Sequence, residues 1–128
     1  MPKNNNRPVF LDLARIRLPI TALISIAHRI AGIVLFLSIP FAIYLLDLSL
    51  GSQLGYNRVQ DLLGHTSIKW LVIFIFWALA HHVYAGLRVL LIDLGIGVER
   101  DEARRTAWAI AIGSVVTLAM ITGILLWL

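Results

Sequence analysis

The chain contains no cysteine among its 128 residues. Disulfide bridges, cysteine-ligated zinc or iron–sulfur clusters and thiol catalysis are therefore excluded within it. Charge is also scarce, because Asp, Glu, Lys and Arg make up 14% of the residues, against roughly a quarter in soluble domains. A soluble domain this small buries only about two-thirds of its surface and needs charge to cover the rest. That class is excluded, and any metal or cofactor must be held by His, carboxylate or Met.

Hydrophobic residues make up 59% of the chain and give it a mean hydropathy of +0.86. Three runs lack Asp, Glu, Lys and Arg altogether, and they cover residues 30–46, 70–87 and 106–128. Each run is close to the ~20 residues that cross the hydrocarbon core of a bilayer. Because backbone groups cannot stay unpaired in lipid, each run must be helical. The sequence therefore predicts an all-α integral membrane protein, whose single transmembrane domain (residues 20–128) has three spanning helices at about 20–48, 67–94 and 104–128.

The segments outside these spans are short. Residues 1–19 are predicted to form an amphiphilic cytoplasmic arm on the membrane surface; they are not a signal peptide, because no uninterrupted apolar region follows them. The segment GSQLGYNRVQDLLG, residues 51–64, has glycines typical of turns and is predicted to be a loop. A second loop, GIGVERDEARR, residues 95–105, is charged and hydrophilic.

Basic residues indicate the orientation in the membrane. The arm and the second loop share one side and hold Lys3, Arg7, Arg15, Arg17, Arg100, Arg104 and Arg105. The other side has only Arg58 and Lys69. Because cytoplasmic segments carry the excess of basic residues, the N-terminus is predicted to be cytoplasmic and the C-terminus periplasmic. These charges flank the spans rather than forming a basic face, which argues against nucleic-acid binding.

Two histidines lie inside the spans at matched depth. At 1.5 Å per residue, His28 and His82 are both ~15–18 Å from the cytoplasmic side. An ionisable group at such depth costs at least ~2.5–3.5 kcal/mol unless something compensates it. Each is followed four residues later by a glycine on the same helix face, Gly32 or Gly86. Bare backbone at that place admits either a flat macrocycle, as axial ligation of haem iron requires, or another helix.

Spacing alone leaves several roles open. His81 is next to His82 but on a different helix face, so either is a candidate ligand. Arg88 either meets the propionates of a cofactor or extends to the membrane interface. Ser114 and Thr117 are expected to be ordinary packing positions of the third helix.

Ser25, His28 and Arg29 crowd one patch of the first helix, because they are spaced i, i+3 and i+4. The hydroxyl and the guanidinium can hydrogen-bond the oxygens of a lipid-soluble quinone. In the alternative interpretation, Arg29 pairs with a carboxylate of a partner protein and Ser25 bonds to its own helix.

Two stretches resemble a known family. RPVFLDLARIRLPITALISIAHRIAG, residues 7–32, and AHHVYAGLRVLLIDLG, residues 80–95, resemble the cytochrome b556 subunit of bacterial succinate dehydrogenase, the larger of its two membrane anchors. The motifs are S-x-x-H-R-x-x-G in the first helix and H-x-x-x-G-x-R in the second. One position departs from the pattern: many relatives have His directly after that Arg, where this chain has Val89.

The resemblance implies a heteromeric helical bundle in the bacterial inner membrane, with one haem b shared with a second small membrane-anchor subunit. It implies that a flavoprotein subunit with FAD oxidises succinate and that an iron–sulfur subunit passes the electrons to ubiquinone, within the tricarboxylic acid cycle and the aerobic respiratory chain. The residues that match the family motifs are His82 as haem axial ligand, His28 and Arg88 near the haem propionates, and Ser25 and Arg29 at the quinone.

Two alternative functions stay open. An anchor of fumarate reductase would run the chemistry in the opposite direction, usually with menaquinone, and His82 argues against those members that lack haem. A purely structural membrane anchor would leave the ionisable side chains inside the spans without a reason.

The charge asymmetry makes a prediction about topology. With seven basic residues on one side against two on the other, a C-terminal alkaline phosphatase fusion should be active and a C-terminal fluorescent protein dark. The opposite pair of signals would overturn the orientation.

Overall fold

The computed structural model describes residues 17–127, so most of the arm predicted over residues 1–19 lies outside the described residues. Within them the chain forms four helices: α1 (Ile20–Gly51), α2 (Gln53–Gly64), α3 (Thr66–Asp93) and α4 (Arg100–Trp127). Three of these, α1, α3 and α4, are long and apolar enough to cross a membrane. The all-α membrane fold class predicted from the sequence is confirmed, since no strand occurs in residues 17–127.

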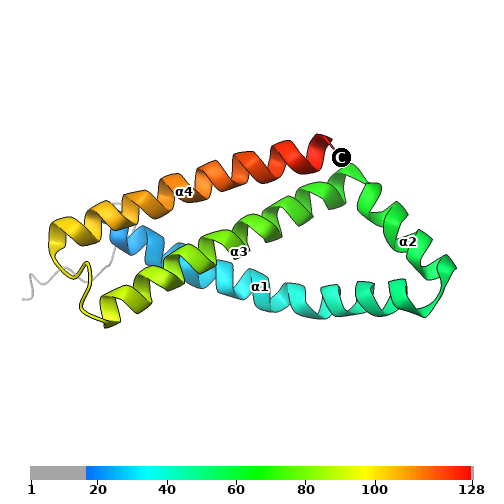
Figure 1. Cartoon of the computed structure of the whole chain (residues 1–128), viewed down its shortest axis with the longest axis horizontal. Coiled ribbons are helices and arrows are strands. Elements are labelled where there is room, and N and C mark those ends of the chain that lie inside the picture. Colours follow the sequence, from blue (N-terminus) through cyan, green and yellow to red (C-terminus); the bar gives the residue numbers. More distant parts are fainter. Residues whose placement is uncertain (1–16, 128) are drawn as a thin grey trace, which may run out of the picture.

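The central helix of the bundle is α3. Figure 1 shows α1 crossing it at an angle, while α4 runs along its other side. The three helices meet where Ile24, Ala85, Ala107 and Ile110 pack together. Two of these residues are alanines that are almost completely buried, Ala85 at 1% exposed and Ala107 at 0%. Small side chains at the meeting point let the helix backbones approach closely, as is usual for membrane helices.

The sequence prediction for residues 51–64 was wrong, because this segment is the helix α2 rather than a loop. Ser52 caps the helix by accepting a hydrogen bond on its Oγ from the backbone N–H of Gly55 (3.0 Å). Gly55 is buried against the backbone carbonyl of Leu48, where a Cβ would collide. The glycine that suggested a turn therefore serves the close contact between α1 and α2. Ser52 was the signal that could have identified the helix start.

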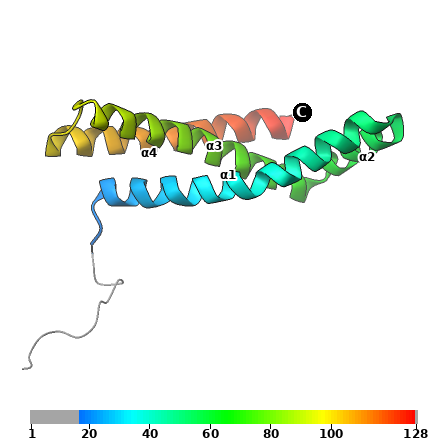
Figure 2. The same cartoon turned by 90° about the horizontal axis from the view of Figure 1, so that it is seen from below.

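α1 is longer than a bilayer requires, since 32 residues extend over ~48 Å. Pro40 lies inside the helix and removes one backbone hydrogen bond. Figure 2 shows the C-terminal part of α1 turned away from the line of its N-terminal part. The change of direction therefore sets where α2, which begins at Gln53, leaves the end of α1.

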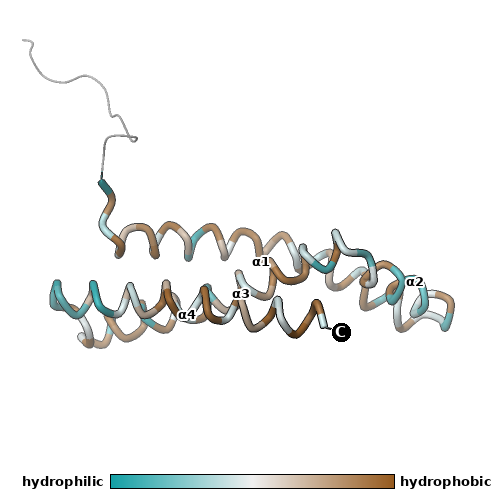
Figure 3. The backbone as a smooth tube through the Cα atoms, turned by 90° about the horizontal axis from the view of Figure 1, so that it is seen from above, coloured by the Kyte–Doolittle hydropathy of each residue, from teal (hydrophilic) through white to brown (hydrophobic). Residues whose placement is uncertain are grey.

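The surface of the bundle is apolar along the spans and polar at the helix ends. Figure 3 shows hydrophobic backbone positions along the middle of α1, α3 and α4, and hydrophilic positions in α2 and at the start of α4. Large hydrophobic side chains such as Phe36 and Phe41, both 71% exposed, point outward. This is the pattern of a chain whose surroundings are lipid or other membrane helices.

Candidate functional site

The crossing of α1 and α3 brings together His28 and His82. Their imidazole rings lie 4.2 Å apart between centroids and are tilted by 35°. Both side chains are half-buried. The matched depth predicted from the sequence thus becomes direct contact between the two rings.

Each histidine packs against the glycine of the opposite helix. A Cβ on Gly32 of α1 would lie 3.1 Å from Cε1 of His82, and a Cβ on Gly86 of α3 would lie 3.5 Å from Nε2 of His28. The two glycines therefore leave room for the imidazole rings of the facing helix. Packing against the facing helix accounts for both glycines in the described chain, and the approach of a flat macrocycle stays a prediction.

A hydrogen bond defines the state of the His82 ring. Its Nδ1 lies 3.1 Å from the backbone carbonyl oxygen of His28. A carbonyl oxygen can only accept, so Nδ1 carries the proton and donates it. In the neutral ring Nε2 is then unprotonated and has a lone pair. Within residues 17–127, Nε2 of His82 has no hydrogen-bond partner.

The neighbouring His81 faces α4 instead. It is 4% exposed, and its Nδ1 shares a hydrogen bond of 2.8 Å with Oγ of Ser114. The indole of Trp77, one turn earlier on α3, donates to the backbone oxygen of Ser114 at 3.1 Å. One turn later, the Tyr84 hydroxyl bonds Thr117 of α4 at 3.0 Å. A row of polar contacts therefore joins α3 to α4, and His81 belongs to it.

Arg88 also lies on the α4 side of α3. Its Nε donates to Oγ1 of Thr106 at 3.2 Å, and one terminal nitrogen donates to the backbone oxygen of Ala103 at 3.2 Å. Arg88 is thus bound to the first turns of α4, and the structure does not bring it to the ring pair of His28 and His82. Within the described chain Arg88 therefore ties α3 to α4, and its contact with a cofactor stays a prediction.

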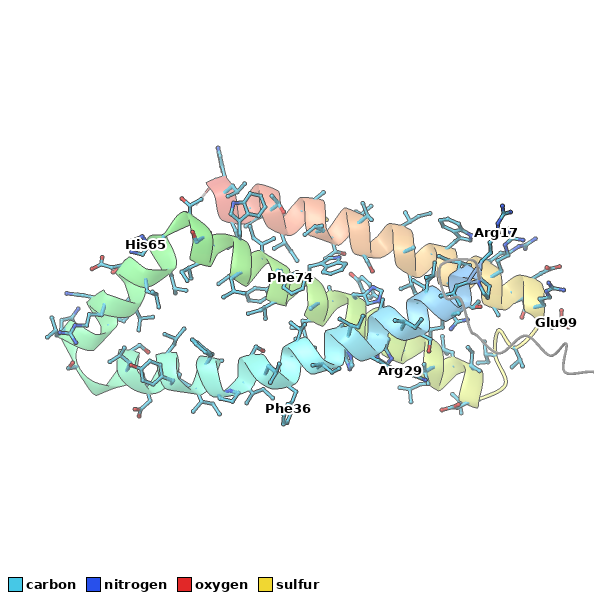
Figure 4. All side chains as sticks on the ribbon, turned by 180° about the vertical axis from the view of Figure 1, so that it is seen from behind. Arg17, Arg29, Phe36, His65, Phe74 and Glu99 are labelled. Atoms are coloured by element: carbon cyan, nitrogen blue, oxygen red, sulfur yellow. The ribbon has the colours of Figure 1, made fainter. Side chains whose placement is uncertain are left out.

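Ser25 and Arg29 are both exposed on α1. Figure 4 shows Arg29 near the point where α1 crosses α3. Within residues 17–127, neither the Ser25 hydroxyl nor the Arg29 guanidinium forms a hydrogen bond or an ion pair, although Ser38 and Ser49 each bond their own helix. The alternative in which Ser25 bonds its own helix is therefore not what the structure shows. Both groups are exposed hydrogen-bond donors.

Comparison with known proteins gives the family. The model of the succinate dehydrogenase/fumarate reductase transmembrane subunit matches residues 3–126. The chain belongs to this family. Its members include the cytochrome b556 subunit of the succinate dehydrogenase of Coxiella burnetii, 36% identical over 97% of this chain and 99% of the relative. The corresponding subunit of Paracoccus denitrificans is 35% identical over 91% of this chain and 89% of the relative.

A further member, the succinate dehydrogenase cytochrome b560 subunit of Reclinomonas americana, is 33% identical over 82% of this chain and 76% of its own length. The family resemblance inferred from the sequence is thereby confirmed. The prediction of a multi-pass membrane-anchor subunit is confirmed with it.

Sequence reasoning missed the polar row between α3 and α4 in this family member. Ser114 and Thr117 were expected to be ordinary packing positions, yet both bond side chains of α3. The available signal was their spacing: His81, Tyr84 and Arg88 share one face of α3, and Ser114 and Thr117 share one face of α4.

The row yields a prediction about stability. Ser114→Ala removes the partner of the buried His81 Nδ1 and should destabilise the folded protein by about 1 kcal/mol, the upper part of the range measured for hydrogen bonds between membrane helices. Ser49→Ala is the matched control, since that hydroxyl only bonds its own helix at an exposed position. Thermal denaturation of the purified complex measures both. Equal midpoints for the two variants would contradict a stabilising role.

Proposed function

We propose that this chain is the haem b-binding membrane anchor of a succinate:ubiquinone oxidoreductase and contributes to its quinone site. The observation that carries the proposal is the ring of His82. Its Nδ1–H is bound by the His28 carbonyl, so in the neutral ring Nε2 has a free lone pair, and Nε2 has no partner in the described chain. That is the form of imidazole that binds haem iron, because the ligating nitrogen needs a lone pair and the other nitrogen a fixed acceptor.

The residues at the crossing fit a haem. His82 would supply one axial ligand, and a second anchor subunit would supply the other. When bound, the haem accepts and releases single electrons within the membrane. The relatives named cytochrome b556 and cytochrome b560 support a haem of the b type. His81 would be the poorer ligand, because it is buried against α4 with its Nδ1 on Ser114 and its Nε2 is buried as well.

His28 would act beside the ligand. Its Nε2 is buried and lacks a hydrogen-bond partner within residues 17–127, a costly state for a nitrogen in a low-dielectric interior. A haem propionate would satisfy it with a charge-assisted bond, for which the buried nitrogen would have to turn toward the cofactor. Arg88 is also proposed to serve the propionates, and its guanidinium would have to do so while held to α4 by Thr106 and Ala103.

Ser25 and Arg29 are proposed to hold the quinone. Reduction of a quinone requires donors on its carbonyl oxygens, which become more negative as electrons arrive. The Ser25 hydroxyl and the permanently charged Arg29 are such donors, exposed and without partners in the described chain. No carboxylate lies beside them on α1, so the protons would come through water or from a partner subunit.

The proposal includes the other subunits of the complex. The dicarboxylate chemistry would reside on a flavoprotein subunit with FAD, and an iron–sulfur subunit would carry electrons to ubiquinone. A second anchor would cover part of the exposed apolar surface. The chain would lie in the bacterial inner membrane with its N-terminus cytoplasmic. The family description covers fumarate reductase as well, but the matched relatives named above are all succinate dehydrogenase subunits, which favours succinate oxidation.

The first test concerns haem. In His82→Ala the complex should lose the b-type spectrum or show high-spin haem, because the axial nitrogen is gone. His28→Ala should keep a low-spin haem with a shifted potential, because the His28 backbone carbonyl that binds His82 remains. Optical spectra and redox titration of the purified complex measure both. A low-spin haem bound by this chain expressed alone would instead indicate ligation by His28 and His82 together.

The second test concerns the quinone. Ser25→Ala and Arg29→Leu should each lower succinate-to-quinone activity about tenfold or more, the ~1.4 kcal/mol or greater expected when one positioned donor is removed. Ser38→Ala is the control, because that hydroxyl on the same helix bonds the backbone of Leu35. Succinate oxidation with a dye that accepts electrons upstream should survive in all three variants.

The quinone assignment fails under two results. Wild-type quinone reduction in both variants would place the site elsewhere. A parallel fall of dye reduction would mean that Ser25 and Arg29 serve assembly.

A further inference from the structure

The hydrogen bond that fixes His82 depends on access to one carbonyl of α1. The carbonyl oxygen of His28 belongs to a regular helix, where it accepts from the N–H four residues later, that of Gly32. A carbonyl oxygen has a second lone pair, and Nδ1–H of His82 uses it at 3.1 Å. In most helices a side chain at position i+4 lies over this place, because the two positions are neighbours on one face.

The room beside that carbonyl is set by Gly32. A Cβ at this position would lie 3.1 Å from Cε1 and 3.5 Å from Nδ1 of His82. The shorter contact is tighter than most Cβ contacts, so the imidazole would have to shift away from α1 by a few tenths of an ångström. The His28 carbonyl lies on the same turn of α1, and the same movement would lengthen the bond to Nδ1. The stacked ring of His28, 4.2 Å away, limits sideways movement.

We propose that Gly32 is a positioning residue for the cofactor ligand, and this inference rests on the proposed role of His82. The missing side chain at Gly32 keeps Nδ1–H of His82 on the His28 carbonyl. The bond in turn holds the ring in one tautomer and one orientation, with Nε2 as the ligating nitrogen. A donor hydrogen bond at the far nitrogen raises the basicity of the ligating one, and such outer contacts tune a bound metal.

Gly86 provides a matched control within the same pair of rings. It follows His82 by the same four residues as Gly32 follows His28, and it lies in the interior of α3. A Cβ there would meet Nε2 of His28 at 3.5 Å, an ordinary van der Waals contact. Glycine-to-alanine replacement also raises helix propensity equally at both positions. The two variants therefore differ in whether the added methyl group displaces His82 from the carbonyl.

The experiment compares Gly32→Ala with Gly86→Ala in the purified complex. Redox titration and electron paramagnetic resonance of the haem are the measurements. Gly32→Ala should raise the haem midpoint potential and change the low-spin signal, because a weaker bond at Nδ1 makes Nε2 a poorer donor to oxidised iron. Gly86→Ala should change both less than Gly32→Ala does, because its methyl group would contact the His28 ring and not the bond between His82 and the carbonyl. Equal behaviour of the two variants would overturn the inference.

A second measurement decides the case in which the Gly32→Ala complex does not accumulate. In the wild-type complex, the Nδ1 proton of the axial imidazole should persist after transfer to D2O, as detected by its hyperfine coupling, because the carbonyl shields it from solvent. Rapid loss of that proton would overturn the inference. Failure of the proposed function is distinguishable: it would appear as a complex without haem b, or as a haem unchanged in His82→Ala, whatever Gly32→Ala does.

Discussion

The close approach of α1 to α3 at two glycines is the contact on which the rest of the site depends. A helix pair separated by ordinary side chains would hold two imidazoles too far from the opposite backbone to bond it. Here Gly32 and Gly86 each receive the ring of the other helix, and the His28 carbonyl becomes an acceptor for His82. Since the membrane interior offers no water to an unpaired polar group, this backbone acceptor makes the half-buried His82 more tolerable on α3.

The α3–α4 contact obeys the same constraint with different groups. Polar side chains of α3 that point away from α1 find partners on α4, either hydroxyls such as Ser114 or backbone oxygens such as that of Ala103. His81 and His82 are adjacent in sequence, yet they serve different helix contacts because successive residues point ~100° apart on a helix. One of the pair ties the bundle together, and the other keeps a nitrogen available.

The sequence was sufficient for the spans, and it named candidate residues without giving their contacts. Charge-free runs of bilayer length can cross a membrane only as helices. The three long helices therefore follow from hydropathy and from the cost of unpaired backbone groups. The prediction for the segment of α2 was wrong because its glycines were taken as turn residues. Gly55 instead allows a close contact with the backbone of Leu48. The choice between His81 and His82 and the position of Arg88 depended on how α3 is rotated against its two neighbours. That rotation follows from packing between helices, which the pattern within one helix does not contain.

The helix α2 has a consequence for the shape of the chain in the membrane. Its twelve residues extend over ~18 Å and hold the end of α1 apart from the start of α3, whereas the same two helices touch at the histidines. The axes of α1 and α3 thus diverge toward α2. A bilayer tolerates no empty space, so acyl chains or a neighbouring helix must fill the wider half.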